Sequence, residues 1–405
     1  MYYMDRRAFC PFCFGGEKMK TAAVVAEYNP FHSGHKYQLE QTRAAGATHI
    51  VAVMSGNFVQ RGEAAIYDKY LRASAAVKCG ADLVAELPLP WATGTAQTFA
   101  RGAVGIAKAL GGVDMLSFGC ENSDLPVLEK LADTLYSEEY ESIISSQLSQ
   151  SNTFASIRQS AVEALCGAEV AKLLEKPNNI LAVEYIAAAK NMNCNFEFNA
   201  VARTGDGYNE ASYSGNGFAS ATAVREAIRS SSFSPSLVPE EVSALYTQVF
   251  SDFSRLDSAV LSKLRTMSVE EIALAPDISE GLENRIYSAI REAVSVDDLL
   301  KKIKTKRYTA ARIRRIILSL FLGVRAADSL GTPPYIRILA CNEKGKEIIS
   351  NASPDIPLVG RASQLKELDG RAGELFALEC RADDIYALSF APARECGAYY
   401  KTKIF

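Results

Sequence analysis

The segment TAAVVAEYNPFHSGH, residues 21–35, decides the fold. Its first six residues form a small, apolar run of the kind found in a buried β-strand. Residues 27–31 break this run, because Pro30 fixes its own φ angle and restrains Asn29 to an extended conformation. A helix is expected to begin near Gly34 and to end by Gly46, with apolar residues at helical spacing between them. The segment therefore predicts a strand, a sharp turn and a helix N-terminus in that order.

The end of this segment also predicts a phosphate site. The chain has 3 histidines, and two of them, His32 and His35, flank Ser33 and Gly34. A His-x-Gly-His string would arise by chance about 0.001 times in such a composition. The first turn of a helix attracts anions, and Gly34 lets the backbone approach a phosphate closely. Imidazole donors could stabilise the charge that builds on phosphate oxygens during nucleotidyl transfer. The alternative is two structural histidines in a turn.

The alternation seen at residues 21–35 continues along the first half of the chain. Apolar strands are expected at 48–54, 83–87 and 115–119, and helices at 67–79 and 95–110. This order is typical of an α/β fold, in which helices cover both faces of a parallel sheet. Ligands of such sheets bind at the carboxyl ends of the strands, which here precede the loops 27–35, 55–61, 88–91 and 119–122.

The region after the first sheet has a different pattern. Residues 125–190 are mostly helical, and one more strand is expected at 196–202. A Ser-rich segment ending at residue 236 is read as a linker. A helical region follows to about residue 330, and then a small α/β tail with a strand at 335–340. We therefore expect one domain at residues 19–235 and a mostly helical one at 236–405.

A basic run stands out in the second half. Residues 301–325 contain nine Lys or Arg and no acid, although the whole chain has a net charge of -3. Such a run favours RNA backbone binding, and an exposed Tyr308 could stack on a base. Alternatively, the run is the solvated face of an amphipathic helix, since Arg312 and Arg315 share a face while Ile313 and its neighbours Ile316 and Ile317 point inward. The candidate RNA contacts are Lys304, Lys306, Arg307, Arg312 and Arg315.

Composition narrows the class of protein. Hydrophobic residues make up 48% and charged residues 22%, as in an ordinary globular protein. The nine scattered cysteines indicate reduced thiols rather than a disulfide framework. Cys10 and Cys13 have the spacing of half a zinc or redox site, but nothing completes it, so no metal site is expected.

We expect residues 1–18 to be a disordered extension from a start assigned too early. No apolar stretch is long enough to span a bilayer, so we expect a cytoplasmic protein with no membrane partner, and no protein partner is inferred.

Three strings together carry a family resemblance: AEYNPFHSGH at 26–35, MSGNFVQRG at 54–62 and SATAVR at 220–225. They closely resemble the bacterial tRNA(Met) cytidine acetate ligase family of the HxGH nucleotidyltransferase superfamily, from Met19 to the C-terminus. The resemblance implies a Rossmann-like (HUP-type) nucleotidyltransferase domain followed by a tRNA-binding domain. It implies an ATP-dependent ligase that converts acetate to acetyl-adenylate and acetylates N4 of the wobble cytidine of elongator tRNA(Met), giving N4-acetylcytidine. The substrates would be ATP, acetate and that tRNA, and whether Mg²⁺ accompanies ATP stays open.

The same resemblance implies a set of site residues. His32 and His35 would be catalytic, placed against the phosphates. Ser220, Thr222 and Arg225 would hold the β- and γ-phosphates, with Ala221 where many superfamily members have Ser. Gly119, Asn178 and Arg203 would be further ATP contacts, although Asn178 could instead be a helix cap. The nucleotide-binding turn would comprise Val25, Ala26, Glu27, Tyr28, Asn29, Pro30, Phe31, His32, Ser33, Gly34, His35, Lys36, Tyr37 and Gln38.

Three other functions compete with this one. A small-molecule adenylyltransferase of coenzyme synthesis shares the HxGH site, but such enzymes are usually compact and lack a basic second half. A non-catalytic tRNA-binding protein would not need both histidines and Arg225, which are all present. An aminoacyl-tRNA synthetase with an HxGH site would carry a KMSKS-like segment, and this chain has none. The sequence therefore favours the tRNA-modifying ligase.

Overall fold

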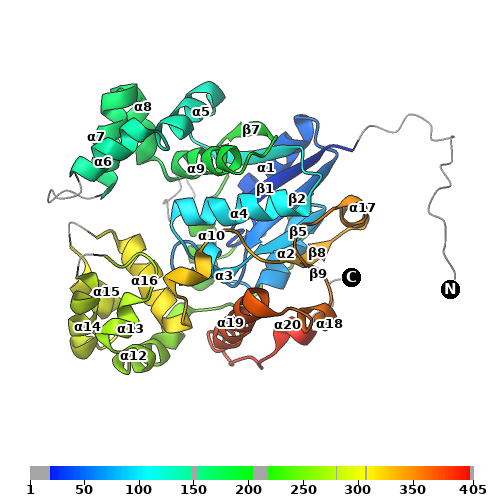
Figure 1. Ribbon diagram of the computed structural model, residues 1–405. Helices are drawn as coiled ribbons and strands as arrows, with labels where there is room; N and C mark the ends of the chain where they lie inside the picture. The colour runs from blue at the N-terminus through cyan, green and yellow to red at the C-terminus, as the bar shows by residue number, and fades with distance from the viewer. Residues whose placement is uncertain (1–18, 148–153, 204–217, 280, 306–307, 402–405) are drawn as a thin grey trace, which may run out of the picture.

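The computed structural model describes residues 19–147, 154–203, 218–279, 281–305 and 308–401 (Figure 1). Residues 1–18, with Cys10 and Cys13, lie outside these ranges. The centre of the molecule is a seven-stranded sheet with the strand order β7-β6-β1-β2-β5-β8-β9. In that order the strands are Glu197–Ala202, Met115–Cys120, Thr21–Ala26, His49–Ser55, Leu83–Leu87, Ile336–Cys341 and Leu358–Val359.

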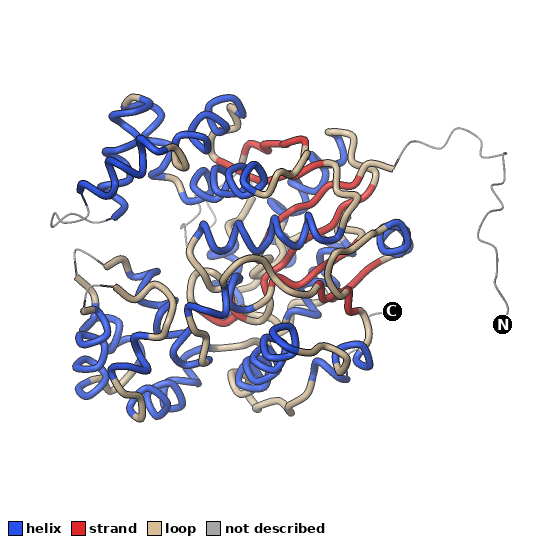
Figure 2. Tube along the Cα trace, viewed as in Figure 1, coloured by secondary structure: helices blue, strands red, loops and turns tan. Residues whose placement is uncertain are grey.

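The predicted parallel sheet is confirmed for β7, β6, β1, β2 and β5. Alternate residues of β1 face opposite sides, so that Ala23 and Val25 join one hydrophobic core while Ala22 and Val24 join another. The first core is covered by α4 (Ala96–Leu110) and α9 (Pro177–Asn191). The second is covered by α1 (Ser33–Ala44), α2 (Lys69–Lys78) and α10 (Ala221–Arg229), so the strands lie between two helical layers (Figure 2).

The loops at the carboxyl ends of the strands carry short additional elements. A small antiparallel hairpin, which the sequence did not predict, joins β3 to β4 in the loop after β2. The helices α5 to α8 and a following 3-10 turn lie between β6 and α9. The bounds are β3 (Phe58–Val59), β4 (Glu63–Ala64), α3 (Leu89–Ala92), α5 (Leu125–Thr134), α6 (Glu138–Gln147), α7 (Phe154–Cys166), α8 (Ala168–Ala171) and the turn Lys172–Glu175.

The second half begins with the expected helical region, seen as a separate group of helices in Figure 1. Its last helix, α16, is amphipathic as predicted, with Ile313, Ile316 and Ile317 buried. Thr309 caps its first turn by accepting from the Arg312 N–H, and Gly323 ends it with a left-handed φ of 79°. The helices are α11 (Glu240–Ser243), α12 (Asp257–Arg265), α13 (Val269–Ala273), α14 (Leu282–Glu292), α15 (Val296–Ile303) and α16 (Ala310–Leu322), with 3-10 turns at Pro235–Leu237, Phe253–Leu256 and Ala326–Ser329.

The tail contributes a strand to the sheet of the first half, which its sequence did not predict. The expected strand at 335–340 is present as β8, but it pairs antiparallel with β5 and so extends the sheet of the first half. The remaining elements are α17 (Glu343–Asn351), α18 (Ala362–Leu365), α19 (Gly370–Ala387) and α20 (Ala398–Lys401). The proposed division at residue 235 therefore separates two stretches of sequence, while the chain after it returns to the first sheet.

A buried cluster of charges fixes this return. Lys69 of α2 lies 2.6 Å from Glu86 of β5 and 2.7 Å from Asp383 of α19. Arg337 of β8 lies 3.3 Å from the same Glu86, and Glu379 of α19 accepts a hydrogen bond from the Leu89 N–H. All five side chains are buried, so leaving any of the charges unpaired would be costly.

Two further properties concern the described part of the chain. No helix in it is long and apolar enough to cross a membrane. The described cysteines form no disulfide with one another, and no group of three or more His, Cys, Asp or Glu side chains in the described ranges could hold a metal ion.

Candidate active site

The two histidines of the turn cap the helix that follows them. His32 is the N-cap of α1, and its Nδ1 accepts a hydrogen bond of 3.1 Å from the Gly34 N–H. In return, His35 Nδ1 accepts a bond of 3.2 Å from the His32 N–H, and the two ring centroids lie 3.8 Å apart. Because both Nδ1 atoms are acceptors, each neutral ring carries its proton on Nε2. The local backbone thus fixes the tautomer of both rings.

Electrostatics keep both rings neutral. Burial, together with the nearby charges of Arg203 and Arg225, lowers the pKa of His32 to about 3. Burial likewise holds the pKa of His35 well below its usual range, assisted by His32 and Arg203. The sequence left open whether these imidazoles are neutral or protonated. The structure favours two neutral Nε2–H donors in a site that already holds positive charge.

Two adjoining cavities lie at the carboxyl ends of β1 and β6. Residues of all three family strings line the main cavity, and those of the first and third strings were predicted, so segments far apart in the chain converge on one site. The main cavity is lined by Val25, Ala26, Glu27, Tyr28, Asn29, His32, His35, Gln38, Gly119, Asn178, Arg203, Ser220 and Arg225. The adjoining cavity adds Gly34 and Tyr37 and shares His32, His35, Gln38, Gly119, Arg203 and Ser220.

Some residues of the predicted set serve the site only indirectly. Phe31 is fully buried in the core, and Lys36 pairs with Glu241. Thr222 accepts hydrogen bonds from Arg225 and Arg61, so it orients guanidinium groups. The predicted residues that line neither cavity, all of them within the described ranges, are Pro30, Phe31, Ser33, Lys36 and Thr222.

The second motif is attached directly to the turn. Ser220 caps α10 by accepting from the Ala223 N–H at 3.0 Å. One turn later, Arg225 donates from Nη1 to the backbone oxygen of Asn29 at 2.7 Å. Its side chain is nearly buried, and burial lowers its pKa while Glu63 opposes that shift. A cation is therefore held between the turn and the start of α10, where phosphates would lie.

The three residues predicted as further ATP contacts also line the main cavity. Asn178 does not cap α9, whose N-cap is Lys176, and it donates instead to Glu121 Oε1 at 2.7 Å. Arg203 directly follows β7. A Cβ placed on Gly119 would meet no protein atom closer than 3.8 Å, so the protein tolerates it and only the cavity would be filled. The alternative that Asn178 is only a cap is therefore wrong.

Some lining residues were not predicted. Arg61 and Gln60 follow β2 and belong to the second family string, so a signal for them was present in the sequence. The apolar lining comes from core helices and strands, where no pattern distinguishes a lining residue from an ordinary core residue. These residues are Phe99, Phe118, Leu181 and Tyr185, together with Ala221.

The basic run is less exposed than expected. Tyr308 is only 7% exposed and lies under the Arg312 guanidinium, so the prediction of an exposed stacking aromatic is wrong. Arg312 and Arg315 contact the Asp277 carboxylate at 3.3 Å and 3.1 Å. Lys304 is exposed, whereas Lys306 and Arg307 lie outside the described residues.

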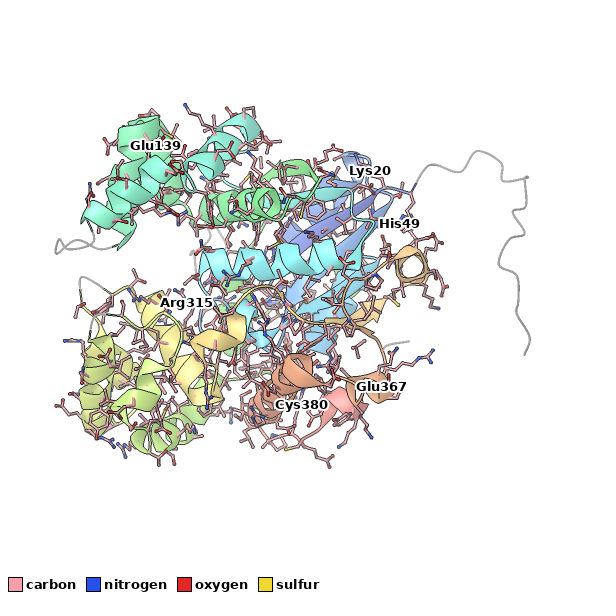
Figure 3. All side chains as sticks on the ribbon, viewed as in Figure 1. Lys20, His49, Glu139, Arg315, Glu367 and Cys380 are labelled. Carbon is pink, nitrogen blue, oxygen red and sulfur yellow. The ribbon has the colours of Figure 1, made fainter. Side chains whose placement is uncertain are left out.

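This helix nevertheless lies beside the candidate site. Gly62, at the end of the second family string, has a φ of 77°, and a Cβ there would lie 2.7 Å from the backbone of Arg314 and Arg315. The loop that brings Arg61 into the main cavity is therefore in close contact with α16. Figure 3 labels Arg315, and the exposed Arg314 precedes it on the helix.

A parallel sheet whose first strand ends in a phosphate-binding turn, with neutral imidazole donors and a cation from a second helix start, defines a nucleotidyltransferase of the HxGH class. The family model described as HIGH Nucleotidyl Transferase matches residues 19–398. The relatives below place the chain more narrowly. It belongs to the tRNA(Met) cytidine acetate ligase family within that class.

The similarity extends over most of the chain. A tRNA(Met) cytidine acetate ligase of Caldanaerobacter subterraneus subsp. tengcongensis is 37% identical over 367 residues, which are 86% of this chain and 90% of the relative. A protein of the same name from Thermoanaerobacter sp. (strain X514) is 38% identical, with the same coverage. The crystal structure of Thermotoga maritima TmcAL bound with alpha-thio ATP superposes with a TM-score of 0.84 at 33% identity, covering 94% of this chain and 97% of that chain.

Proposed function

We propose that this protein is an ATP-dependent tRNA(Met) cytidine acetate ligase. In the first step, acetate attacks the α-phosphorus of ATP, pyrophosphate is displaced from that phosphorus, and acetyl-adenylate forms. In the second, N4 of the wobble cytidine of elongator tRNA(Met) takes the acetyl group, and AMP leaves. The observation that carries the proposal is that His32, His35 and Arg225 meet in one site in a chain whose relatives bear this name over 86% of its length.

The first step needs charge stabilisation and positioning more than a covalent nucleophile. Negative charge shifts toward the phosphate oxygens as pyrophosphate leaves, and the two histidines that line the cavity would supply their Nε2–H groups as preorganised donors. One such donor is typically worth about 3–4 kcal/mol of barrier. Arg203 and Arg225 supply positive charge on the same side. A crystal structure of TmcAL contains an ATP analogue, which supports ATP as the nucleotide here.

The tRNA would lie across α16 and the loop at residues 56–62, because the exposed Arg314 lies on that helix where the helix contacts this loop. We keep Lys304, Lys306 and Arg307 as proposed backbone contacts and add Arg314. Arg312 and Arg315 are assigned to the support of this surface, since both already pair with Asp277. Mg²⁺ would bind through the ATP phosphates. The cytoplasm is the place where a tRNA substrate would be met.

The test supplies protein, ATP, radiolabelled acetate and bulk tRNA, followed by nucleoside digestion of the RNA. Labelled N4-acetylcytidine is expected, together with acetate-dependent exchange of pyrophosphate into ATP in the absence of tRNA. If the rate of pyrophosphate exchange did not depend on acetate but increased with a small phosphorylated acceptor, the protein would instead be a coenzyme adenylyltransferase. Tight tRNA binding without either reaction would identify a non-catalytic binding protein.

A further inference from the structure

The second half-reaction requires a group that accepts a proton. N4 of cytidine attacks the carbonyl carbon of acetyl-adenylate, the bond between that carbon and the phosphate oxygen breaks, and AMP leaves with the electron pair. The attacking amine begins with two protons and ends in the amide with one. A positioned base that takes the other proton typically accelerates such a step by about 10²–10⁴-fold.

The histidines cannot be that base. The Nδ1 of His32 accepts from the Gly34 N–H, and the Nδ1 of His35 accepts from the His32 N–H. Each Nε2 therefore already carries the proton of the neutral ring. A further proton would have to break the cap of α1 and add a charge beside Arg203 and Arg225, which burial already opposes. Both rings are thus donors only.

Glu27 has the position and chemistry of a base. Among the described residues that line the main cavity, it is the only one with a carboxylate. It follows the last residue of β1, and Arg72 holds its backbone oxygen from Nη1 at 2.5 Å. Its Oε1 accepts a bond of 2.7 Å from the Gln60 N–H. The fully buried Arg72 therefore holds the backbone of Glu27, and the Gln60 N–H holds its carboxylate.

The surroundings of Glu27 also suit a base. Burial and, to a smaller extent, the Glu63 carboxylate raise the pKa of the Glu27 carboxyl, while Arg61, the Gln60 N–H and Arg225 oppose the shift. A carboxylate with a raised pKa binds a proton more strongly, and the neighbouring cations favour its ionised form before the reaction. The acetyl-adenylate carbonyl would form near the histidines, which line the same cavity.

We propose that Glu27 is the general base of the acetyl-transfer step, accepting the N4 proton of cytidine as AMP leaves. This inference rests on the proposed function, because it concerns the second step of that reaction. The adenylation step needs no base, since acetate attacks as an anion. Glu27 therefore separates the two half-reactions, whereas His32 and His35 act in the first.

The decisive variant is Glu27→Gln, which keeps an oxygen that can accept from the Gln60 N–H but cannot take a proton. Acetate-dependent exchange of pyrophosphate into ATP should fall far less than the transfer step, because exchange depends on the shape of the turn but not on a proton acceptor at Glu27. Transfer from synthetic acetyl-adenylate to tRNA, measured in a single turnover, should slow by about 100-fold or more. Glu40→Gln is the matched control, because Glu40 is exposed on α1 and lies outside both cavities, and both steps should be unchanged in it.

A pH profile distinguishes proton transfer from a structural role. The wild-type transfer rate should rise with pH as Glu27 ionises and then level off, and this rise should be absent from Glu27→Gln. Transfer at the wild-type rate and pH profile in Glu27→Gln would overturn the inference. An equal loss of exchange and transfer, with a lowered melting temperature, would also overturn it, because Glu27 would then only hold the loop. Wild-type protein without acetate-dependent exchange would instead refute the proposed function.

Discussion

The phosphate-binding turn and the basic run at residues 301–325 were the two most conspicuous features of the sequence, yet they differ in how far their sequence determines their structure. In the turn, the Nδ1 atoms of His32 and His35 accept from the N–H groups of Gly34 and His32, so these two hydrogen bonds lie within the tetrapeptide. In the basic run, Arg312 and Arg315 pair with Asp277, which lies more than 30 residues away. The sequence of a local motif therefore predicts the geometry of its side chains. The sequence of a charged run does not, because its side chains pair with residues far away in the chain.

The largest expected effect is in the turn. In His35→Ala, acetate-dependent exchange of pyrophosphate into ATP should fall by at least about 100-fold, because a preorganised phosphate donor is lost. The fold should persist, since the lost cap interaction is worth only about 1 kcal/mol. The control is His49→Ala, which removes the one histidine outside the motif (labelled in Figure 3). His49 pairs with Glu347 and lines neither cavity. Unchanged exchange in His35→Ala would refute the role of His35.

A smaller effect is expected at Gly119, which tests whether the adjoining cavity holds the nucleoside. In Gly119→Ala, the new methyl group would meet Arg203 and Gln38 only at ordinary contact distance, so the melting temperature should not change. If adenosine fills the cavity, the methyl group overpacks the complex by about 1–3 kcal/mol. The KM for ATP should then rise by about tenfold. An unaltered KM would place the nucleoside elsewhere.

Local features of the fold and site could be predicted from the sequence, whereas features that depend on distant contacts could not. The first strand, the start of α1 and most of the turn were predicted because strand periodicity, Pro30 and Gly34 act locally. The hairpin at residues 58–64 was not predicted, because its two strands are too short to show a strand periodicity. The pairing of β8 with β5 was not predicted, because it joins segments far apart in the chain. Tyr308 shows the same limit, since its burial depends on how α16 packs. Arg61 could have been selected from its string, but its place in the cavity required the fold.

The basic run predicts a smaller effect, confined to tRNA binding. The double variant Lys304→Ala/Arg314→Ala should weaken tRNA binding several-fold and lower the slope of log affinity against log salt by about 1 per lost phosphate contact. Acetyl-adenylate synthesis without tRNA should continue. Both residues are exposed, and neither forms an ion pair with another described residue.

The matched double variant, Arg312→Ala/Arg315→Ala, removes the same charge from the same run. It leaves Asp277 unpaired, so its melting temperature should fall while its salt slope stays closer to that of wild type. Fluorescence titration with tRNA at several salt concentrations separates the two variants. If Arg312→Ala/Arg315→Ala lowered the slope of log affinity against log salt more than Lys304→Ala/Arg314→Ala did, Arg312 and Arg315 would bind RNA directly. The function of the basic run would then be as predictable from the sequence as that of the turn.

The smallest effect concerns the buried cluster that joins the two halves of the chain. Burial and, after it, the neighbouring Glu86 raise the pKa of Glu379 from 4.5 to about 7, against the opposing effect of Lys69 and Arg337. The folded state therefore binds this proton more tightly than the unfolded state. The resulting stabilisation is complete below pH 4.5 and is lost as the pH rises through about 7.

The variant Glu379→Gln keeps an acceptor for the Leu89 N–H. In this variant the change in the free energy of unfolding with pH should be smaller than in wild type by about 1 kcal/mol, since the charged groups of the cluster share the proton. Urea denaturation from pH 4.5 to 8 measures the difference, with Glu343→Gln on exposed α17 as the control. A pH dependence equal to that of wild type would mean that the cluster keeps Glu379 ionised, and that the two halves are joined by charge pairs alone rather than by a shared proton.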